Sequence, residues 1–388
     1  MADALRDPVA ILSAGPVAAY PSVSRAMARP LLYDYDRQFQ EFYEAAARKA
    51  ARALRTRQPA LILHVEPAPG IEAAAASLIG PDDVVLNLVS GVYGAGFTGW
   101  ARRYAKAVHE VAVPFDDAID PEAVAVALRR HPETRIVSVV HHDTPSGTIN
   151  PVREIGGIVR AHGALLLVDA VSSFAGMDIH PDDCEADVFI TGPGKCLGGA
   201  PGLTVMAVSD RAWAAMHDNP RAPRASVLSL LDWKEAWRAD QPFPFTPSVA
   251  EMYGLDAALD QYLAEGAASV WARHATTARA CRAGLEALGL KLWPARPAIA
   301  SPTTTAVRIP EGLSGEHLLA AARERLGVVL SGGRGETQGK LLRIGHMGPV
   351  AEPLYATVAV TALGAALRQH GHRCDIGAAV EAALAAIG

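Results

Sequence analysis

The stretch ITGPGKCLGGAPG, residues 190–202, decides the fold, because it places a lysine in a glycine- and proline-rich turn directly after an apolar strand. A lysine there is poorly placed as a solvated surface charge, and the glycines let the backbone approach a ligand closely. Partial burial would lower the pKa of the Lys195 amine and make it a nucleophile. A phosphate-binding lysine would explain the same turn, so the residues alone leave two interpretations open.

A second polar residue closes the strand-like segment that precedes this turn. Residues 163–170 read GALLLVDA, so Asp169 ends an apolar run. Ligands bind at the carboxyl ends of the strands in an open parallel sheet, and a buried carboxylate needs a partner. A protonated pyridine nitrogen would be such a partner, and the cationic ring would then accept electrons from a carbanion. A helix cap or an ion pair remains the alternative for Asp169 alone.

Short apolar runs of this kind recur over the first two thirds of the chain and alternate with helical patterns. The predicted strands are 59–65, 83–89, 134–140, 163–170, 186–191 and 202–208, and the helix candidates are 71–79, 121–131 and 151–163. Near-continuous apolarity suits strands that are buried on both faces of a mostly parallel sheet. The alternation predicts an α/β layered domain.

The pattern changes after about residue 248, where long helical stretches lead into short strands. The segments TTTAVRIP (303–310), GVVLSGG (327–333) and KLLRIGHMG (340–348) alternate with helices. A chain of 388 residues is also too long for one compact core. We expect an N-terminal segment over 1–20, a large α/β domain over 21–275 that carries Lys195, and a small α+β domain over 276–388.

Composition indicates which partners the protein does not bind and in which cellular compartment it is expected. The net charge of −5 argues against a nucleic-acid partner, which would require a basic surplus. The sequence has no uninterrupted apolar run of about 18 residues and no signal-peptide pattern. We therefore expect a cytoplasmic protein with no membrane partner. Reduced thiols are expected for the four widely spaced cysteines, which are Cys184, Cys196, Cys281 and Cys374.

Taken together, the polar signals are more specific than any one of them. Asp169 is followed after 26 residues by Lys195 and later by Arg343 in the segment RIGHMG, although a lone arginine is usually a surface charge. This order resembles the fold-type I pyridoxal-phosphate enzymes. The segments LSAGPVAAYP, HHDTPSG, VDAVSS, TGPGKCL and RIGHMG are similar to segments of the class V aminotransferases of the alanine–glyoxylate and serine–glyoxylate kind. The resemblance covers essentially the whole chain.

The resemblance implies a role for each matching residue. Lys195 would form an aldimine with a pyridoxal-type aldehyde and would move a proton as general base and acid. Asp169 would partner the ring nitrogen, Tyr93 would stack on the ring, and Thr144 would bond to the ring oxygen. Arg343 would hold the carboxylate of the amino-acid or keto-acid substrate in a bidentate pair.

The sequence departs from the family pattern where the family binds the cofactor phosphate. The turn HVEPAPG (64–70) carries Pro67 and Pro69, which have no N–H to offer, and Glu66, which is negatively charged. At about 5 Å and an effective dielectric of about 20, two like charges repel by roughly 3 kcal/mol. Gly194 replaces the glutamine that the family places before its lysine. These changes remove phosphate donors and add an acidic group.

Further departures fall on residues around the expected ligand. Phe243 stands where the family has a tyrosine that reaches the phosphate from the neighbouring subunit, whereas Thr246 is retained. Tyr33 falls where the family has a glycine, so we expect it in the pocket, and Arg334 replaces an apolar residue and is expected to assist Arg343. The resemblance implies a homodimer or homotetramer with its sites near the subunit interface.

We interpret these departures as a site for a ligand with a hydroxymethyl group in place of the phosphate. The expected reaction converts pyridoxamine and pyruvate to pyridoxal and L-alanine, a step in vitamin B6 degradation. Pyridoxal and pyridoxamine would then be substrates, and no cofactor would stay permanently bound. Glu66, Phe243 and Thr246 are expected to contact this ligand together with the family residues.

Several alternatives differ in their chemistry. An aminotransferase of the alanine– or serine–glyoxylate type, dependent on pyridoxal phosphate, remains the main one, and it would need another group such as Arg334 to bind the phosphate. A cysteine desulfurase would need a nucleophilic cysteine on a small-domain loop, but no cysteine lies between Cys281 and Cys374. A ligand-sensing regulator would usually carry an additional basic DNA-binding module, and the sequence contains none. His141 and His142 lack further ligands at a suitable spacing, so we expect hydrogen bonding at a strand end and no metal site.

Overall fold

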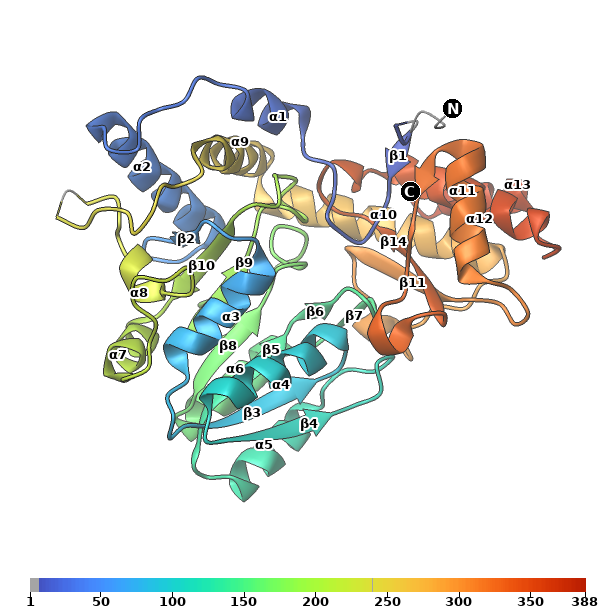
Figure 1. Ribbon diagram of the computed structural model, residues 1–388. Coiled ribbons are helices and arrows are strands. Elements are labelled where there is room, and N and C mark those ends of the chain that lie inside the picture. Colours follow the sequence, from blue (N-terminus) through green and yellow to red (C-terminus); the bar gives the residue numbers. More distant parts are fainter. Residues whose placement is uncertain (1–6, 239) are drawn as a thin grey trace, which may run out of the picture.

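The computed structural model describes residues 7–238 and 240–388, and its centre is a seven-stranded sheet (Figure 1). The strand order is β2-β10-β9-β8-β5-β3-β4, and only β10 runs antiparallel to its neighbours. The strands are β2 (Leu61–Leu63), β3 (Val84–Val89), β4 (Ala107–Ala112), β5 (Thr134–Val140), β8 (Leu165–Asp169), β9 (Val188–Thr191) and β10 (Thr204–Val208). The predicted mostly parallel α/β sheet is confirmed.

Two layers of helices cover the sheet, because successive strand side chains point to opposite faces. In β8, Leu166 and Val168 enter one apolar core, and Leu165 and Leu167 enter the other. The first core contains residues from α2 (Arg37–Leu54), α5 (Pro121–Arg130), α6 (Val152–His162) and α9 (Val249–Glu265). The second contains residues from α3 (Pro67–Leu78), α4 (Val92–Tyr104), α7 (Asp210–Asp218) and α8 (Leu230–Trp233).

Local sequence explains where several of these helices begin and end. Pro121 opens α5 after Asp120, whose side chain accepts a hydrogen bond from the backbone N–H of Glu122. Gly163 ends α6 in the left-handed region at φ 92°. Strand β4 escaped the sequence analysis because it lies at the sheet edge, where its half-buried segment AVHEVA lacks a continuous apolar run.

A smaller antiparallel sheet and four helices form the C-terminal part of the chain. The sheet order is β11 (Thr304–Arg308), β14 (Leu341–Gly345) and β13 (Ser331–Gly332). The helices are α10 (Ala267–Ala287), α11 (Gly315–Leu326), α12 (Pro353–Gln369) and α13 (Ile376–Ala385). Because α10 runs across the boundary expected at residues 275 and 276, the domain limits stay a prediction.

The N-terminal segment returns to this smaller part. Strand β1 (Ala10–Ile11) pairs in parallel with β12 (Val328–Val329), far from the large sheet (Figure 1). The remaining elements are α1 (Pro21–Met27), the hairpin of β6 (His142–Asp143) and β7 (Thr148–Ile149), and the 3-10 helices η1 (Pro297–Ile299), η2 (Gly335–Thr337) and η3 (Gly348–Val350).

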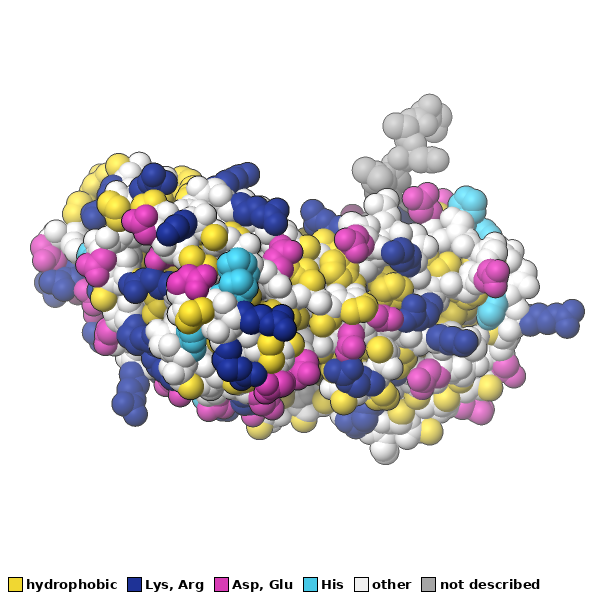
Figure 2. Space-filling model, turned by 90° about the horizontal axis from the view of Figure 1, so that it is seen from below, with side chains coloured by type: hydrophobic (Ala, Val, Ile, Leu, Met, Phe, Trp, Pro, Cys, Tyr) yellow, Lys and Arg dark blue, Asp and Glu magenta, His cyan; other side chains and the backbone are white. Residues whose placement is uncertain are grey.

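Surface properties agree with a chain of small net charge. On the face drawn in Figure 2, basic and acidic side chains are interspersed over the surface. Among the described residues, no helix combines the length and the apolar character needed to cross a bilayer.

Candidate active site

A cavity of about 570 Å³ opens at the carboxyl ends of strands β9, β8 and β5, between the sheet and helices α3 and α4. Parallel strands bring residues that are far apart in sequence to this edge. Six of the predicted residues line the cavity, namely Glu66, Tyr93, Thr144, Asp169, Lys195 and Arg334.

The amine of Lys195 is held against the N-terminal segment. Its Nζ donates a hydrogen bond to the carbonyl oxygen of Ala14 at 2.9 Å. Gly15, at φ 112°, packs so closely that a Cβ there would lie 1.9 Å from Nζ. Burial lowers the pKa of the Lys195 amine, and the positive charge of Arg343 acts in the same direction. A larger share of unprotonated amine favours attack on a carbonyl carbon.

Asp169 ends β8 and faces the same cavity. One carboxylate oxygen accepts a hydrogen bond from the backbone N–H of Val171 at 2.9 Å. Burial raises the pKa of the Asp169 carboxyl to about 6, and the nearby Asp143 carboxylate contributes to this rise. A protonated pyridine nitrogen beside Asp169 would supply the positive partner that this carboxylate lacks.

Thr144 follows hairpin strand β6 and is fully buried at the cavity wall. Its Oγ1 has no hydrogen-bond partner among the residues that the structure describes. A buried hydroxyl without a partner is costly, so a ligand oxygen would fit beside it. This observation and the placement of Asp169 show that the site suits a pyridoxal-type ring.

The two predicted arginines are neighbours, although only Arg334 lines the cavity. The Nε of Arg343, on β14, donates a hydrogen bond to the carbonyl oxygen of Gly332 at 2.7 Å. Burial lowers the pKa of the Arg343 guanidinium, the charges of Tyr93 and Asp143 oppose this effect, and the charge of Arg334 reinforces it. Two adjacent cations form a place where a substrate carboxylate would be stabilised.

Asp143 is a site residue to which the sequence analysis assigned no role. Its carboxylate accepts hydrogen bonds from the backbone N–H groups of Tyr93 at 2.8 Å and Gly94 at 3.4 Å, in the first turn of α4. The backbone at Gly91 lies so close that a Cβ there would come within 2.2 Å of the Asp143 Cγ. Asp143 thereby fixes the helix end that presents Tyr93. Its place in the segment HHDTPSG was the only available signal.

The other predicted contacts do not line the cavity of their own chain. Phe243 packs in an aromatic cluster, with ring centroids 5.0 Å from Tyr43 and 5.6 Å from Phe39. Thr246 is exposed. Tyr33 is 65% exposed and lies beside Tyr35. Their expected contribution to the site of a neighbouring subunit stays a prediction.

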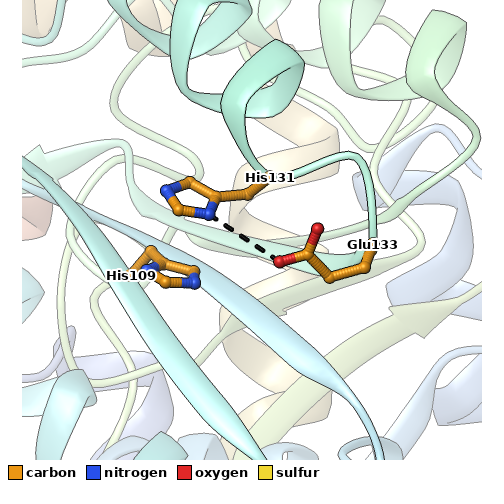
Figure 3. A group of neighbouring side chains, drawn as sticks. All are labelled: His109, His131 and Glu133. Atoms are coloured by element: carbon orange, nitrogen blue, oxygen red, sulfur yellow. Dashed lines mark ion pairs between the residues drawn. The ribbon is translucent and has the colours of Figure 1, made fainter.

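One group of possible metal ligands lies on the surface, away from this cavity. Ligand atoms of His109, His131 and Glu133 lie within 4.8 Å of one another (Figure 3). The two imidazole rings are stacked, with centroids 3.5 Å apart and an angle of 16° between their planes. Lone pairs lie in the ring planes, so they run side by side here and do not converge on one ion. We therefore assign no metal to this group.

Comparison with known proteins identifies relatives over nearly the full length. The family described as aminotransferase class V matches residues 18–348. A curated relative from Mesorhizobium japonicum, named pyridoxamine–pyruvate transaminase, is 62% identical over 381 residues, which cover 98% of this chain and 97% of the relative.

Solved structures agree with this match. The crystal structure of pyridoxamine–pyruvate aminotransferase from Mesorhizobium loti has a TM-score of 0.97 at 62% identity and covers 98% of this chain and 97% of its own. The ureidoglycine–glyoxylate aminotransferase of Bacillus subtilis has a TM-score of 0.93 at 28% identity, with 99% of each chain covered.

The expectation that no cofactor stays permanently bound is wrong. The family match and both structural neighbours indicate a fold-type I family that uses pyridoxal phosphate as a bound cofactor. The donors lost at the turn are visible in the sequence, whereas the positive end of a helix at the site is a property of the folded chain. Pro67 and Ala68, the first residues of α3, line the cavity. A helix N-terminus favours an anion.

Proposed function

The chain belongs to the class V aminotransferases, and from that premise we propose that it transfers the amino group of pyridoxamine to pyruvate, giving pyridoxal and L-alanine. The observation that carries the proposal is the placement of Lys195 and Asp169 in one cavity, in a chain 62% identical to an enzyme named for these substrates. Such a reaction would serve vitamin B6 degradation.

Lys195 is the group that moves protons in this proposal. A pyridoxal-type ring, when bound, supplies the carbonyl and amine chemistry and takes up the electrons released at the substrate carbon. Lys195 needs an unprotonated amine to accept a proton from one carbon and return it to another. Burial, which lowers the pKa of this amine, supports that role.

Asp169, Thr144 and Tyr93 hold the ring in place. Asp169 pairs with the ring nitrogen and keeps it protonated, which an uncharged side chain could not do. The unpartnered Oγ1 of Thr144 bonds to the ring oxygen. Tyr93, fixed by Asp143 through the first turn of α4, covers the ring face.

Arg334 and Arg343 bind the pyruvate carboxylate, and Glu66 accepts a hydrogen bond from the ring hydroxymethyl group. The proximity of the two arginines supports a shared carboxylate, because bidentate pairs fix both position and plane. Glu66 lines the cavity. It lies between the end of β2 and the first residue of α3.

We also infer a homodimer or homotetramer in which Tyr33, Phe243 and Thr246 contact the ligand of a neighbouring subunit. Their absence from the cavity of their own chain supports this arrangement. Light scattering of the purified chain would test it, and a monomer would contradict it. The described cysteines are all free, which supports a reducing, cytoplasmic location.

The test of the reaction is direct. Purified enzyme with pyridoxamine and pyruvate should form pyridoxal and L-alanine in equal amounts, measured by chromatography. The second candidate, transfer from L-alanine or L-serine to glyoxylate, is tested in parallel. Turnover with glyoxylate and none with pyridoxamine would overturn the proposal.

A further inference from the structure

Arg273 is a largely buried arginine to which the proposed reaction gives no role. It lies on α10, the helix that runs from the end of α9 into the smaller part of the chain (Figure 1). Its side chain is 13% exposed. Its Nε and Nη2 donate to the two carboxylate oxygens of Glu265 at 2.7 and 3.1 Å. This bidentate pair fixes the plane of the guanidinium and thereby the direction of its remaining N–H groups.

The remaining N–H groups of Arg273 hold two segments that are distant in the sequence. Its Nη2 donates to the hydroxyl of Tyr20 at 3.1 Å. Its Nη1 donates to the carbonyl oxygens of Gly348 and Ala351, each at 3.0 Å. The neighbouring His274, which is fully buried, accepts a hydrogen bond from the backbone N–H of Gly348 through its Nε2 at 3.4 Å. Helix α10 therefore holds both the residue that precedes α1 and the backbone of η3.

Both of these segments contact the turn that carries Lys195. The backbone N–H of Tyr20 donates to the carbonyl oxygen of Gly198 at 2.9 Å, and the N–H of Gly198 donates to the carbonyl oxygen of Lys195 at 2.9 Å. A Cβ at Gly198 would lie 2.3 Å from the Cε2 of Tyr20. A Cβ at Gly348 would lie 2.9 Å from the Cα of Gly198 and 3.2 Å from the carbonyl oxygen of Lys195. The Lys195 turn is thus in close backbone contact with both segments that Arg273 holds.

We propose that Arg273 is a positioning residue for Lys195. One guanidinium holds Tyr20 and η3 against the Lys195 turn, and Ala14, which accepts the hydrogen bond of the Lys195 amine, belongs to the same N-terminal segment as Tyr20. Close-packed interiors transmit small shifts, so the loss of Arg273 would displace the turn. The inference rests on the proposed function, in which Lys195 is the group that moves protons.

The Lys195 amine is sensitive to its position because burial controls its protonation. Burial lowers the pKa of this amine, Cys196, Asp169 and Glu66 oppose the effect, and Arg343 reinforces it. A displaced turn would admit water to the amine and raise its pKa toward the ordinary value. The unprotonated share at neutral pH would then fall, and proton transfer by Lys195 would become slower.

Three variants test this assignment. Arg273→Met removes every donor and keeps an unbranched apolar side chain. Tyr20→Phe removes only the hydroxyl and keeps the aromatic ring, so it should show the same changes to a smaller degree. Arg211→Met is the matched control, because Arg211 also donates to two backbone carbonyl oxygens, those of Gly163 and Ala164 at 2.9 and 3.0 Å. These two residues directly precede β8, at the end of the strand remote from the cavity.

Amide hydrogen exchange of the enzyme as purified, read by mass spectrometry, measures how firmly the turn is held. The peptides that contain Tyr20 and Gly198 should exchange faster in Arg273→Met than in the wild type, whereas Arg211→Met should leave them unchanged. We expect kcat to fall by at least about ten-fold in Arg273→Met, since a displacement of about 1 Å can cost more than that. The KM for pyruvate should change little. The acid limb of the kcat–pH profile should move to higher pH in Arg273→Met, which a general loss of stability would not cause.

Two results would overturn the inference. Unchanged hydrogen exchange in the two peptides of Arg273→Met would show that Arg273 does not hold the turn. A lower melting temperature with an unshifted acid limb would indicate a purely structural role. The exchange comparison needs no substrate, so its result is independent of the reaction. Wild-type enzyme that fails to turn over pyridoxamine would overturn the proposed function, and the exchange result would still decide whether Arg273 holds the Lys195 turn.

Discussion

The Nζ of Lys195 and the carbonyl oxygen of Ala14 are joined by a hydrogen bond of 2.9 Å, although 181 residues separate them in the sequence. The lysine belongs to the large sheet, and the N-terminal segment pairs through β1 with β12 in the smaller part. The nucleophile is thus positioned by both parts of the chain.

Gly15→Ala tests this positioning. A Cβ at Gly15 would lie 1.9 Å from Nζ, and φ 112° disfavours any other residue. We expect kcat to fall by at least about ten-fold, since a displacement of about 1 Å can cost more than that. Gly157→Ala, on α6 with open space around it, is the control and should leave kcat unchanged. Equal kcat values in the two variants would contradict the positioning role.

Lys195→Ala should abolish turnover, because the amine that attacks the carbonyl and moves protons is lost. Borohydride reduction of the wild-type enzyme with pyridoxal should attach the ring covalently to Lys195, and peptide mass spectrometry would identify the site. Label on a peptide containing a different lysine would show that the nucleophile has been misassigned.

The two arginines should contribute separately to keto-acid binding. Arg343→Ala and Arg334→Ala should each raise the KM for pyruvate by roughly ten- to hundred-fold, as expected when a charge-assisted pair is lost. Arg130→Ala, an exposed arginine on α5, serves as the control. If Arg334→Ala changes only the KM for pyridoxamine, Arg334 contacts the ring and the two-arginine clamp is wrong.

Asp143→Ala should affect both stability and ligand binding. It removes the acceptor for the first turn of α4, which costs about 0.5–2 kcal/mol of unfolding free energy, and it loosens Tyr93. We expect a higher KM for pyridoxamine. Asp120→Ala removes a comparable cap from α5 and should lower stability without changing KM. Stability is read from urea unfolding, and equal KM values would show that Asp143 acts only as a cap.

Asp169→Asn should stabilise the ligand-free protein while it abolishes turnover. Burial raises the pKa of this carboxyl to about 6 from 3.8, so the folded state holds its proton more strongly than the unfolded state. The associated stability is present below about pH 4 and is lost as pH rises through about 6. The variant should therefore melt higher than wild type at pH 7 and similarly at pH 4. Asp182→Asn, at an exposed position, is the control and should change neither the melting temperature nor the turnover. A lower melting temperature at pH 7 would contradict the burial argument.

Sequence patterns predicted the elements whose signal is local. Lys195 and Asp169 each follow an apolar run that is buried on both faces, so the pattern identified both the strand and the residue at its end. Edge strand β4 gave no such pattern because water covers part of it. Hydrogen bonding was expected for His142, but its partners could not be named, since Ser172 and Thr303 lie 30 and 161 residues away in the sequence.

The cofactor expectation failed for a related reason. Pro67 and Glu66 are visible in the sequence as lost or repelling groups, but the place of the α3 N-terminus at the cavity wall exists only in three dimensions. The anion-binding character of the site depends on contacts between distant segments, which the sequence of a single turn does not reveal.

The pairing of the first strand with residues near the end of the chain has a consequence for biosynthesis. Ala10 pairs with Val328, and the carbonyl oxygen of Leu12 accepts from the backbone N–H of Gly345 at 2.8 Å. A ribosome must therefore release most of the chain before these pairings can hold Ala14 beside Lys195. Contacts of such high sequence separation form late, and exposed apolar surface persists until then. Truncated nascent chains should accordingly depend on chaperones and carry an unpositioned lysine.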